Sequence, residues 1–400
     1  MPIKHATIVP LIGGITLGSE AAFGSKPEYL LSYTPFVNND QHIVKYYGEE
    51  VNYGLIDEGF KFNLQKGKID VVSATCPCAG LSSLSQGARS DADANDWMSI
   101  SAKYVLENIQ PRVFWGENAP RLASKLGEPV VAKLRKIGKQ NGYTFMIYKT
   151  KSILHGMSQV RDRTFYFFFK DNKIPLFPYF QRPNEKIEET IRSASKNKKD
   201  SMNVLVNTRT PSQEPFYKFV LEEMENGITH KQFQDKIVKS TNPQDYLEAM
   251  GVSYQTVSKW MHKNKIDKYA EKCLRIAAKL DAGGNVMRKT TEIPKDYIGA
   301  FVGHMPTNMT HPDEDRFMTI RECMGVMKLP KDFILQGGIR NLNHICQNVP
   351  VTTATDMGEC IKQYIAGDIN EFVGSDFAII DNKTKSYNGE IEVSSLEQFL

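Results

Sequence analysis

Two cysteines flank a proline directly after an apolar run, and no other stretch of the sequence is better suited to nucleophilic chemistry. The run "IDVV" is followed by "SATCPCAG", which places Cys76 and Cys78 where a buried strand would end. A cysteine acts as a nucleophile when its thiolate is stabilised, for instance by backbone N–H groups that converge at a strand-to-helix turn. A free cysteine is more often a small buried hydrophobic residue. The spacing alone therefore leaves the nucleophile open.

A carboxylic acid follows about forty residues later, at the end of another apolar run. The stretch "WGENAP" places Glu117 and Asn118 at this second strand end. A carboxylate beside the Trp115 ring would have a raised pKa and could serve as a general acid. The alternative for Glu117 is a helix-capping or surface acid.

A glutamine and two arginines precede a strongly apolar segment. In "HGMSQVRDRTFYFFF", Gln159, Arg161 and Arg163 are spaced at i, i+2 and i+4. Side chains alternate along an extended chain, so all three would point to one face. The alternative is a solvated edge on which Asp162 pairs with the arginines.

These residues need a scaffold, and the first third of the chain predicts one. Strands are expected at 6–12, 28–34, 68–74, 111–117, 143–151 and 163–170. Helical spacing is found over 16–23, over 97–109 with Asp96 as its N-cap, and over 129–142, closed by Gly142. Strands that alternate with helices predict an α/β fold with a doubly wound, mostly parallel sheet. Ligands gather beyond the carboxyl ends of such strands, where "TCPCAG" and "GENAP" would lie.

Composition limits the class of protein. A net charge of only +4 over 400 residues means that a nucleic-acid partner would have to be met by a local basic surface. The six cysteines show no paired metal spacing apart from one tight C-x-C, which indicates a reducing compartment without disulfides or a metal site. The N-terminus lacks the apolar core of a signal peptide, and no run approaches the length of a membrane span. We expect a cytoplasmic protein with no membrane partner.

The composition shifts between about 171 and 311, where Lys, Asn, Gln and Ser become frequent and the alternation stops. Within this region, residues 244–263 have the outline of a helix-turn-helix with Gly251 at the turn. The alternative is two helices that simply pack together. In the DNA-reading interpretation, the second helix presents three polar side chains to base edges: Gln255, Ser258 and Lys259.

Taken in order, these stretches resemble the DNA (cytosine-5) methyltransferase family. The Gly-Gly turn, Pro-Cys, Glu-Asn and Gln-x-Arg-x-Arg stretches follow one another as they do in that family. Near the C-terminus, "HPDEDRFMTIRECMGVMKLPKDF" is similar to its Arg-x-Leu-Thr-x-Arg-Glu stretch, and "HICQNVPVTTATDMGECI" to its Gln-x-Gly-Asn-x-Val-Pro stretch. The resemblance covers roughly 6–170 and 311–366, and the differences below indicate a divergent branch, phage-encoded or bacterial.

The resemblance implies the Rossmann-like fold of class I S-adenosylmethionine-dependent methyltransferases, interrupted by a smaller domain. Residues 1–172 would form the catalytic and cofactor-binding domain, and 173–312 the target-recognition domain. Residues 313–400 would return to the large domain and end in a tail with a hairpin around Asn382. The expected partner is duplex DNA, bound by a monomer in the cytoplasm of a bacterium or of a phage's host.

The resemblance also implies roles for the reactive residues. Cys78, directly after the proline, would be the thiolate that adds to C6 of cytosine, and Glu117 would supply the proton to N3. Arg163 would hold the cytosine O2, while Gln159 and Arg161 organise the pocket. Carbon 5 then becomes nucleophilic enough to attack a sulfonium methyl group, after which a base removes the C5 proton and the thiol leaves.

The methyl donor implied by the resemblance is S-adenosylmethionine. Seven residues would contribute to its site: Ile12, Gly13, Gly14, Asn38, Asp57, Pro77 and Asn348. The sequence departs from the family pattern at several of these loops. Leu11 replaces a glycine, Asn38 stands where an acid would bind the ribose hydroxyls, and "CQNVP", which contains Gln347, replaces Gly-Asn-x-Val-Pro. Ala79 replaces the glutamine that usually follows Pro-Cys.

Two other functions share parts of this pattern. An RNA (tRNA) cytosine-5 methyltransferase would use the same catalytic residues, but duplex RNA offers no readable major groove to a helix-turn-helix. A non-catalytic DNA-binding regulator would retain the scaffold without its chemistry, yet the nucleophile, acid and arginine positions are all present. The DNA-modifying enzyme therefore explains the largest number of ordered motifs.

Overall fold

The computed structural model describes most of the chain. The described residues are 2–60, 66–77, 80–82, 89–170, 172–197, 199–210, 213, 215–225, 227–228, 232, 251–283, 296–303, 306–373 and 375–389. Cys78 and the first part of the expected helix-turn-helix, residues 244–250, lie outside them. The chain divides into two compact units, each described below by itself. The large unit is Met1–Glu185, Tyr297–Phe301 and Met324–Leu400, and the small unit is Lys186–Asp296 and Val302–Cys323.

In the described residues, the large unit is built on a nine-stranded sheet with the order β11-β10-β6-β7-β5-β4-β1-β2-β3. Its strands are β1 (His5–Ile8), β2 (Tyr29–Ser32), β3 (Asn52–Leu55), β4 (Val71–Thr75), β5 (Val113–Asn118), β6 (Tyr143–Lys151), β7 (Asp162–Lys170), β10 (Phe377–Asp381) and β11 (Ser386–Gly389). Neighbouring strands are parallel except where β7 pairs with β5 and β6 and where β11 pairs with β10. The predicted doubly wound, mostly parallel sheet is confirmed.

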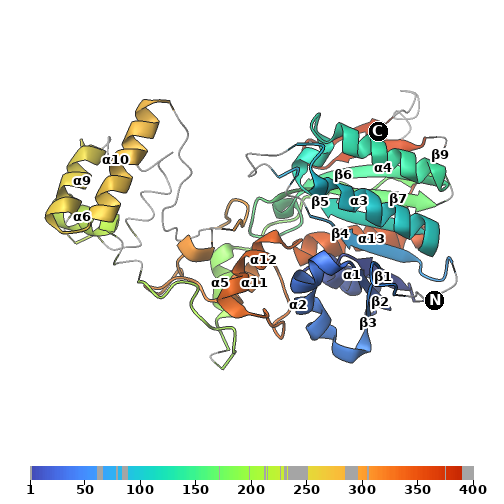
Figure 1. Cartoon of the computed structure of the whole chain (residues 1–400), viewed down its shortest axis with the longest axis horizontal. Helices are drawn as coiled ribbons and strands as arrows, with labels where there is room; N and C mark the ends of the chain where they lie inside the picture. The colour runs from blue at the N-terminus through green and yellow to red at the C-terminus, as the bar shows by residue number, and fades with distance from the viewer. Residues whose placement is uncertain are drawn as a thin grey trace. The chain divides into compact units, whose positions relative to one another are not determined.

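Helices cover both faces of this sheet (Figure 1). The main ones are α1 (Gly14–Phe23), α2 (Val37–Tyr47), α3 (Asp93–Tyr104), α4 (Glu128–Gln140), α12 (Leu342–Gln347) and α13 (Val351–Ala366). Side chains of α3 and α4 pack in one core with one face of the sheet, and side chains of α1 and α13 pack in a second core with the other face. A separate two-stranded sheet joins β8 (Lys173–Pro175) to β9 (Glu371–Val373).

The aromatic run of β7 shows why the sheet needs helices on both faces. Alternate residues point to opposite faces, so Phe165 and Phe167 belong to the α1/α13 core, whereas Tyr166 and Phe168 belong to the α3/α4 core. The Trp115 ring of the neighbouring β5 stacks on Phe167 with ring centroids 5.8 Å apart. A strand buried on both faces reads as a continuous apolar run, as this one does.

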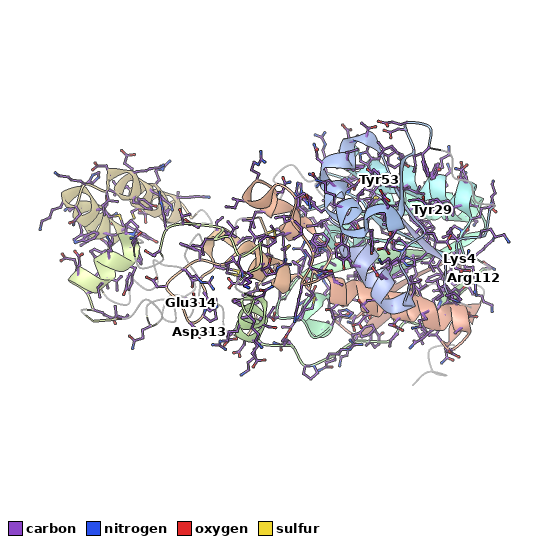
Figure 2. The ribbon with its side chains drawn as sticks, turned by 90° about the horizontal axis from the view of Figure 1, so that it is seen from below. Lys4, Tyr29, Tyr53, Arg112, Asp313 and Glu314 are labelled. Atoms are coloured by element: carbon purple, nitrogen blue, oxygen red, sulfur yellow. The ribbon has the colours of Figure 1, made fainter. Side chains whose placement is uncertain are left out.

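The strand directions fix where the functional residues must be. Lys4 and Arg112, both labelled in Figure 2, directly precede β1 and β5 and so lie at the amino-terminal ends of these parallel strands. The residues that leave the carboxyl ends of β1, β4 and β5 therefore lie at the opposite edge of the sheet.

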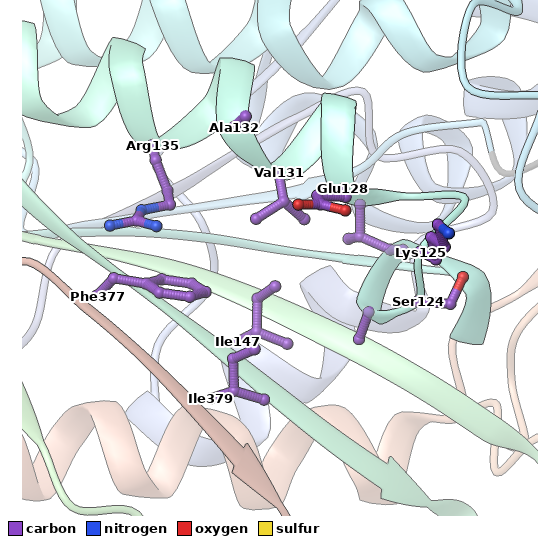
Figure 3. Close-up of a pocket in the computed structure, with 11 residues that line it drawn as sticks. Ser124, Lys125, Glu128, Val131, Ala132, Arg135, Ile147, Phe377 and Ile379 are labelled. Atoms are coloured by element: carbon purple, nitrogen blue, oxygen red, sulfur yellow. The ribbon is translucent and has the colours of Figure 1, made fainter. Parts of the chain in front are cut away.

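The C-terminal hairpin extends the sheet beyond β6. As expected, β10 and β11 form a hairpin whose turn begins at Asn382. A hollow of about 390 Å³ lies between α4 and strands β6 and β10 (Figure 3), and it is lined mainly by aliphatic side chains. The Arg135 guanidinium lies 4.1 Å from the centre of the Phe377 ring at this hollow. None of the predicted site residues lines it.

Two local expectations differ from the structure. Helix α3 begins at Asp93 with Ala92 as its N-cap residue, so the prediction of Asp96 as the cap is wrong. Asp96 lies in the first turn instead, where a carboxylate still favours the positive end of the helix. Strand β3 was not expected, because its four residues include Gly54 and show no alternation. A Cβ atom at Gly54 would lie 2.2 Å from the Phe60 ring, so the strand depends on this glycine.

The small unit is organised around helices. These are α5 (Ile187–Ala194), α6 (Pro215–Glu223), α9 (Tyr254–Lys263) and α10 (Asp267–Asp281). Helices α6, α9 and α10 share one apolar core, in which Trp260 packs against Phe219 with ring centroids 5.6 Å apart. Ser253 is the N-cap residue of α9, and its side chain accepts a hydrogen bond from the Thr256 N–H at 3.2 Å. It is the second helix of the expected helix-turn-helix.

The stretch that resembles Arg-x-Leu-Thr-x-Arg-Glu stabilises a second part of the small unit. The fully buried Glu322 carboxylate accepts hydrogen bonds from Arg316 at 2.8 and 3.0 Å and from the Thr319 N–H at 2.8 Å. Helix α11 (Ile320–Val326) begins here. Asp313 and Glu314, labelled in Figure 2, pair with Arg192 and Arg316 respectively. Within the described residues, no helix is long and apolar enough to cross a membrane.

Candidate active site

The pairing of β4 with β5 brings the cysteine stretch and the predicted acid together. The two strands are parallel neighbours, and Thr75 at the end of β4 is in register with Glu117. The Asn118 side-chain amide donates to the carbonyl oxygens of Cys76 and Pro77, at 3.5 and 3.4 Å. It thus holds the backbone directly before Cys78. Asn118 has no predicted role of its own, although its place in "WGENAP" could have suggested one.

Glu117 is buried at this strand end, with 4% of its surface exposed. Its carboxylate forms an ion pair with the Arg163 guanidinium. Burial raises the pKa of Glu117, and the charges of Arg163 and Arg161 oppose this rise without cancelling it. The expected rise in pKa is therefore confirmed, and its main cause is burial. A raised pKa makes the protonated form of this carboxyl group more accessible, which suits a proton donor.

Cys76 is a structural thiol in this arrangement. Its side chain is buried, with the Sγ atom 3.8 Å from the Ser101 hydroxyl and 3.9 Å from the Tyr166 hydroxyl. Burial raises the pKa of the Cys76 thiol to about 12. A thiol that stays protonated at neutral pH is a poor nucleophile. Of the two cysteines that the sequence leaves open, the structure disfavours Cys76.

Gln159 and Arg161 join loops rather than face solvent. Both side chains are fully buried. The Arg161 guanidinium donates to the carbonyl oxygens of Phe301 (2.7 Å), Cys346 (2.7 Å) and Asn348 (3.2 Å). The Gln159 amide accepts from the Phe301 N–H at 3.3 Å and donates to the Val326 carbonyl at 3.1 Å.

Only Arg163 of the three spaced residues lies within β7. It pairs with Glu117, whereas Gln159 and Arg161 precede the strand and bind the backbone of the loop at Phe301 and of the ends of helices α11 and α12. The structure therefore separates one residue beside the acid from two residues that organise the loops around it.

The Gly-Gly turn packs closely against the last predicted motif. Gly13 has a φ of 101°, a left-handed conformation that suits glycine, and serves as the N-cap residue of α1. The Gly14 N–H donates to the Asn348 side-chain oxygen at 2.8 Å. A Cβ atom at Gly14 would lie 2.0 Å from the Val349 carbonyl oxygen, so no larger residue fits there. Ile12 is buried beside this turn.

The two remaining residues predicted for the cofactor lie near the exit of β2. The Asp57 carboxylate accepts the Thr34 N–H, with both oxygens at 3.0 Å, and so holds the chain that leaves β2. Asn38 is exposed on α2, and its carbonyl oxygen accepts a hydrogen bond from the Gln41 side chain at 2.7 Å. Because β2 ends at Ser32 and α2 begins at Val37, Asn38 is the second residue of this helix and does not lie at the strand end.

A buried acid near this loop was missed. The Asp40 carboxylate is fully buried and accepts hydrogen bonds from the Leu11 N–H at 3.0 Å and the Tyr53 hydroxyl at 3.1 Å. Burial raises the pKa of Asp40 to about 7. Leu11, where the family has glycine, adopts a left-handed φ of 50°, so this hydrogen bond supports an unfavourable conformation. The available signal was the position of Asp40 on the apolar face of α2, between Phe36 and Ile43.

On α9, the three predicted base-reading residues do not share one environment. Gln255 and Lys259 are exposed. Ser258 is 2% exposed and lies on the packed face of the helix, beside Val257. Ser258 is therefore not presented to a ligand in this structure, because the helix turns its side chain toward the core shared with α6 and α10.

Comparison with known proteins agrees with these features. The C-5 cytosine-specific DNA methylase family matches residues 8–363. The chain belongs to this family. The match spans the β4 and β5 strand ends, the small unit and the segment that carries Asn348, so one family accounts for both units. It supports cytosine-5 methylation dependent on S-adenosylmethionine and makes this chain a DNA (cytosine-5) methyltransferase by descent.

Individual relatives are distant. The type II methyltransferase M.AgeI of Thalassovita gelatinovora is 23% identical over 363 residues, which cover 75% of this chain and 84% of that protein. A prophage-encoded E. coli protein, solved as a candidate DNA modification methyltransferase, has a TM-score of 0.54 at 16% identity and covers 91% of this chain and 99% of its own. The Entamoeba histolytica methyltransferase EhMeth has a TM-score of 0.50 at 12% identity, with the same coverage. These structures support the fold.

The family and the fold are those of S-adenosylmethionine-dependent methyltransferases, and the described residues fit this cofactor. The Asn348 amide nitrogen and the Thr16 hydroxyl are buried without a hydrogen-bond partner among the described residues. Both are close to the first turn of α1, where backbone N–H groups favour an anionic group such as the amino-acid carboxylate. The described residues contain no cluster of His, Cys, Asp or Glu placed to hold a metal ion.

Asp40 gives a pH-dependent prediction. With its pKa raised to about 7, the folded protein keeps a proton on Asp40 between about pH 4 and 7 that the unfolded chain releases. The stability that this proton contributes is present below pH 4 and is lost as the pH rises through 7. Asp40→Asn removes the titration, so the free energy of unfolding of the variant relative to wild type should increase with pH across this window. Denaturant unfolding at several pH values measures it.

The matched control is Tyr53→Phe, which removes a donor to the same carboxylate but keeps the acid. Its stability should fall with rising pH as in wild type. Parallel stability curves for Asp40→Asn and wild type would show that Asp40 does not titrate in this range.

Proposed function

We propose that this protein transfers a methyl group from S-adenosylmethionine to C5 of a cytosine flipped out of duplex DNA, through a covalent bond between Cys78 and C6. The observation that carries the proposal is the register of Thr75 with Glu117. It makes the stretch that contains Cys78 leave the sheet beside a buried acid. The family match to residues 8–363 supports the same chemistry.

In the proposed mechanism, the Cys78 thiolate adds to C6 of the cytosine while N3 takes a proton from Glu117. The pair of electrons displaced from the C5–C6 bond makes C5 an enamine carbon and therefore a nucleophile. When bound, S-adenosylmethionine supplies an electrophilic methyl group. Once C5 carries the methyl group, a base removes the C5 proton, the C6–S bond breaks, and the thiolate is restored as N3 returns its proton.

Asn118 and Arg163 are proposed to position these two groups. The Asn118 amide fixes the carbonyl groups of Cys76 and Pro77, and so limits where the next residue can place its thiol. Arg163 holds the Glu117 carboxylate, and a guanidinium at this point can also donate to the cytosine O2. Gln159 and Arg161 act at a distance by fixing the loops.

For the cofactor, we propose that the turn formed by Ile12, Gly13 and Gly14 lies against it, with Pro77 and Asn348 reaching it from other loops. The unpartnered Asn348 amide nitrogen supports this placement. Asp57 holds the exit of β2, where an adenosine would lie in this fold, and its exposed carboxylate leaves further acceptor capacity.

The small unit is proposed to select the target. Extruding a base from a duplex costs a few kcal/mol, which contacts to the rest of the DNA must offset. Gln255 and Lys259, exposed on α9, are the proposed base-edge contacts. Ser258 is left out of the proposal because it is buried.

The substrate class is tested by transfer of labelled methyl from S-adenosylmethionine. We expect label in duplex DNA, at C5 of cytosine, and none in tRNA. Label in RNA alone would show an RNA methyltransferase, and label in neither, with intact cofactor binding, would show a non-catalytic DNA-binding protein.

The nucleophile is tested by a pair of cysteine variants. Cys78→Ser should abolish methyl transfer, because a hydroxyl group is far less nucleophilic at neutral pH than a thiolate. Cys76→Ser should remain active, since Ser101 and Tyr166 can hydrogen-bond the new hydroxyl. Initial rates on the same duplex provide the measurement, and thermal melting checks that both variants fold. An inactive, folded Cys76→Ser protein together with an active Cys78→Ser protein would reverse the assignment.

The general acid is tested by Glu117→Gln, which preserves the shape of the side chain but removes the proton. General acid–base catalysis contributes about 10²- to 10⁴-fold, so the rate of methyl transfer should fall by that factor. The control Glu128→Gln changes an exposed acid on α4 and should leave the rate unchanged. Turnover of Glu117→Gln within about threefold of wild type would mean that N3 is protonated from elsewhere.

A further inference from the structure

Helix α10 of the small unit carries a row of basic side chains at helical spacing. The row has four members. At 100° per residue around the helix axis, they fall within an arc of about 60° and extend about 16 Å along the axis. All four side chains are exposed: Lys268, Lys272, Arg275 and Lys279. We refer to them as the α10 basic stripe.

The stripe faces away from the body of the small unit. The buried positions of α10 are Ala270, Cys273 and Ala277, which pack in the core shared with α6 and α9 and lie on the opposite side of the helix. Among the described residues, no carboxylate is within ion-pair distance of any member of the stripe. On the helix, Glu271 lies about 40° outside the arc, and Asp267 pairs with His262 of α9.

Such a row is unfavourable for the helix alone. Lys268 and Lys272, and likewise Arg275 and Lys279, are like charges at i, i+4, a spacing that destabilises a helix. Glu271, at i, i+4 before Arg275, offsets this repulsion only in part. If this face only had to be soluble, acidic residues could alternate with the basic ones. The pairs at i, i+4 would then carry opposite charges and stabilise the helix. A ligand that carries a line of negative charge would remove the repulsion.

We propose that the α10 basic stripe binds the phosphate backbone of the duplex whose cytosine is methylated. This inference rests on the proposed function and adds a phosphate-binding surface to it. A duplex carries one negative charge per about 1.7 Å of its axis, so a row of about 16 Å can meet several phosphates at once. The contact carries no sequence information and fixes the position of the protein on the DNA.

The connection of α10 to α9 favours duplex DNA over other polyanions. The two helices are joined by the short turn at residues 264–266 and share one apolar core, so they move as one body. Gln255 and Lys259 are exposed on α9, the helix proposed to read base edges. A helix fixed beside a base-reading helix is placed where the flanking phosphates run.

The test compares charge removal with charge retention at the same positions. The first variant carries Lys268→Gln, Lys272→Gln and Lys279→Gln, and the second carries Lys→Arg at the same three positions. Affinity of the full chain for a duplex oligonucleotide is measured by fluorescence anisotropy between 50 and 200 mM salt. The wild-type chain and a separate single variant, Gln255→Ala, are measured in parallel.

The logarithm of the association constant falls linearly with the logarithm of the salt concentration, and we call this the salt slope. Loss of three phosphate contacts should make the salt slope less steep by about 2.7, which corresponds to about 40-fold less change in affinity across this salt range. The Arg variant should keep the wild-type slope. A control with equal charge removal on α3 and α4 of the large unit, Lys103→Gln, Lys133→Gln and Lys136→Gln, should also keep it. Gln255→Ala should change which sites are methylated but not the slope. Unchanged S-adenosylmethionine binding by calorimetry and unchanged melting show that each variant is folded.

The outcomes separate this inference from the proposed function. If wild type methylates duplex DNA and the Gln triple variant retains the wild-type salt slope, the stripe does not bind phosphates and the proposed function stands. If wild type transfers no methyl group to DNA, the proposed function is wrong, and the inference that rests on it is overturned with it. A Gln triple variant that loses affinity for single-stranded RNA but not for duplex DNA would assign the stripe to RNA and overturn the inference.

Discussion

The buried guanidinium of Arg161 is the interaction on which the arrangement of the site depends. It reaches the carbonyl oxygens of Phe301, Cys346 and Asn348, which lie 140 to 187 residues further along the chain. Gln159, two residues earlier, binds the N–H group of the same Phe301. Because Asn348 in turn accepts the Gly14 N–H, the loop after β1 is connected to the same network. Segments from the N-terminal and C-terminal parts of the large unit thus meet around the Arg161 guanidinium.

A cation in this position has a physical cost that its partners must offset. Removing a charged group from water is expensive unless its donors are satisfied, and a hydrogen bond to a charged group contributes about 1.5–3 kcal/mol. The carbonyls of Phe301 and Asn348 lie outside helices and strands and that of Cys346 lies in the last turn of α12, so these acceptors are suitable because such groups lack a partner within a helix or sheet. The same charge also opposes the rise in the pKa of Glu117 that burial causes. One residue thus stabilises the loops and limits how strongly the acid holds its proton.

The sequence predicts the sheet and the strand ends well, because these depend on local patterns. The apolar runs of β4 and β5 with the turns after them, and the start of the antiparallel β7, identify the edge where Glu117 and the cysteine stretch lie. The burial of individual side chains is harder to predict from the sequence, because it depends on tertiary packing. Ser258 and Lys259 are adjacent in the sequence, yet α9 buries one and exposes the other. Asp40 contacts Leu11 from 29 residues away, and only its place on an apolar helix face indicates burial. The choice between Cys76 and Cys78 needed the pKa of the buried thiol.

The central claim is that Cys78 forms a covalent bond with the cytosine beside Glu117. It is tested most directly with a duplex in which 5-fluorocytosine replaces cytosine, incubated with the protein and S-adenosylmethionine. Fluorine at C5 cannot leave as a proton, so the thiol cannot be released and the adduct persists. After proteolysis, mass spectrometry should find the methylated fluorocytosine nucleotide attached to Cys78. Attachment to Cys76, or no adduct from a protein that methylates the unsubstituted duplex, would contradict the account.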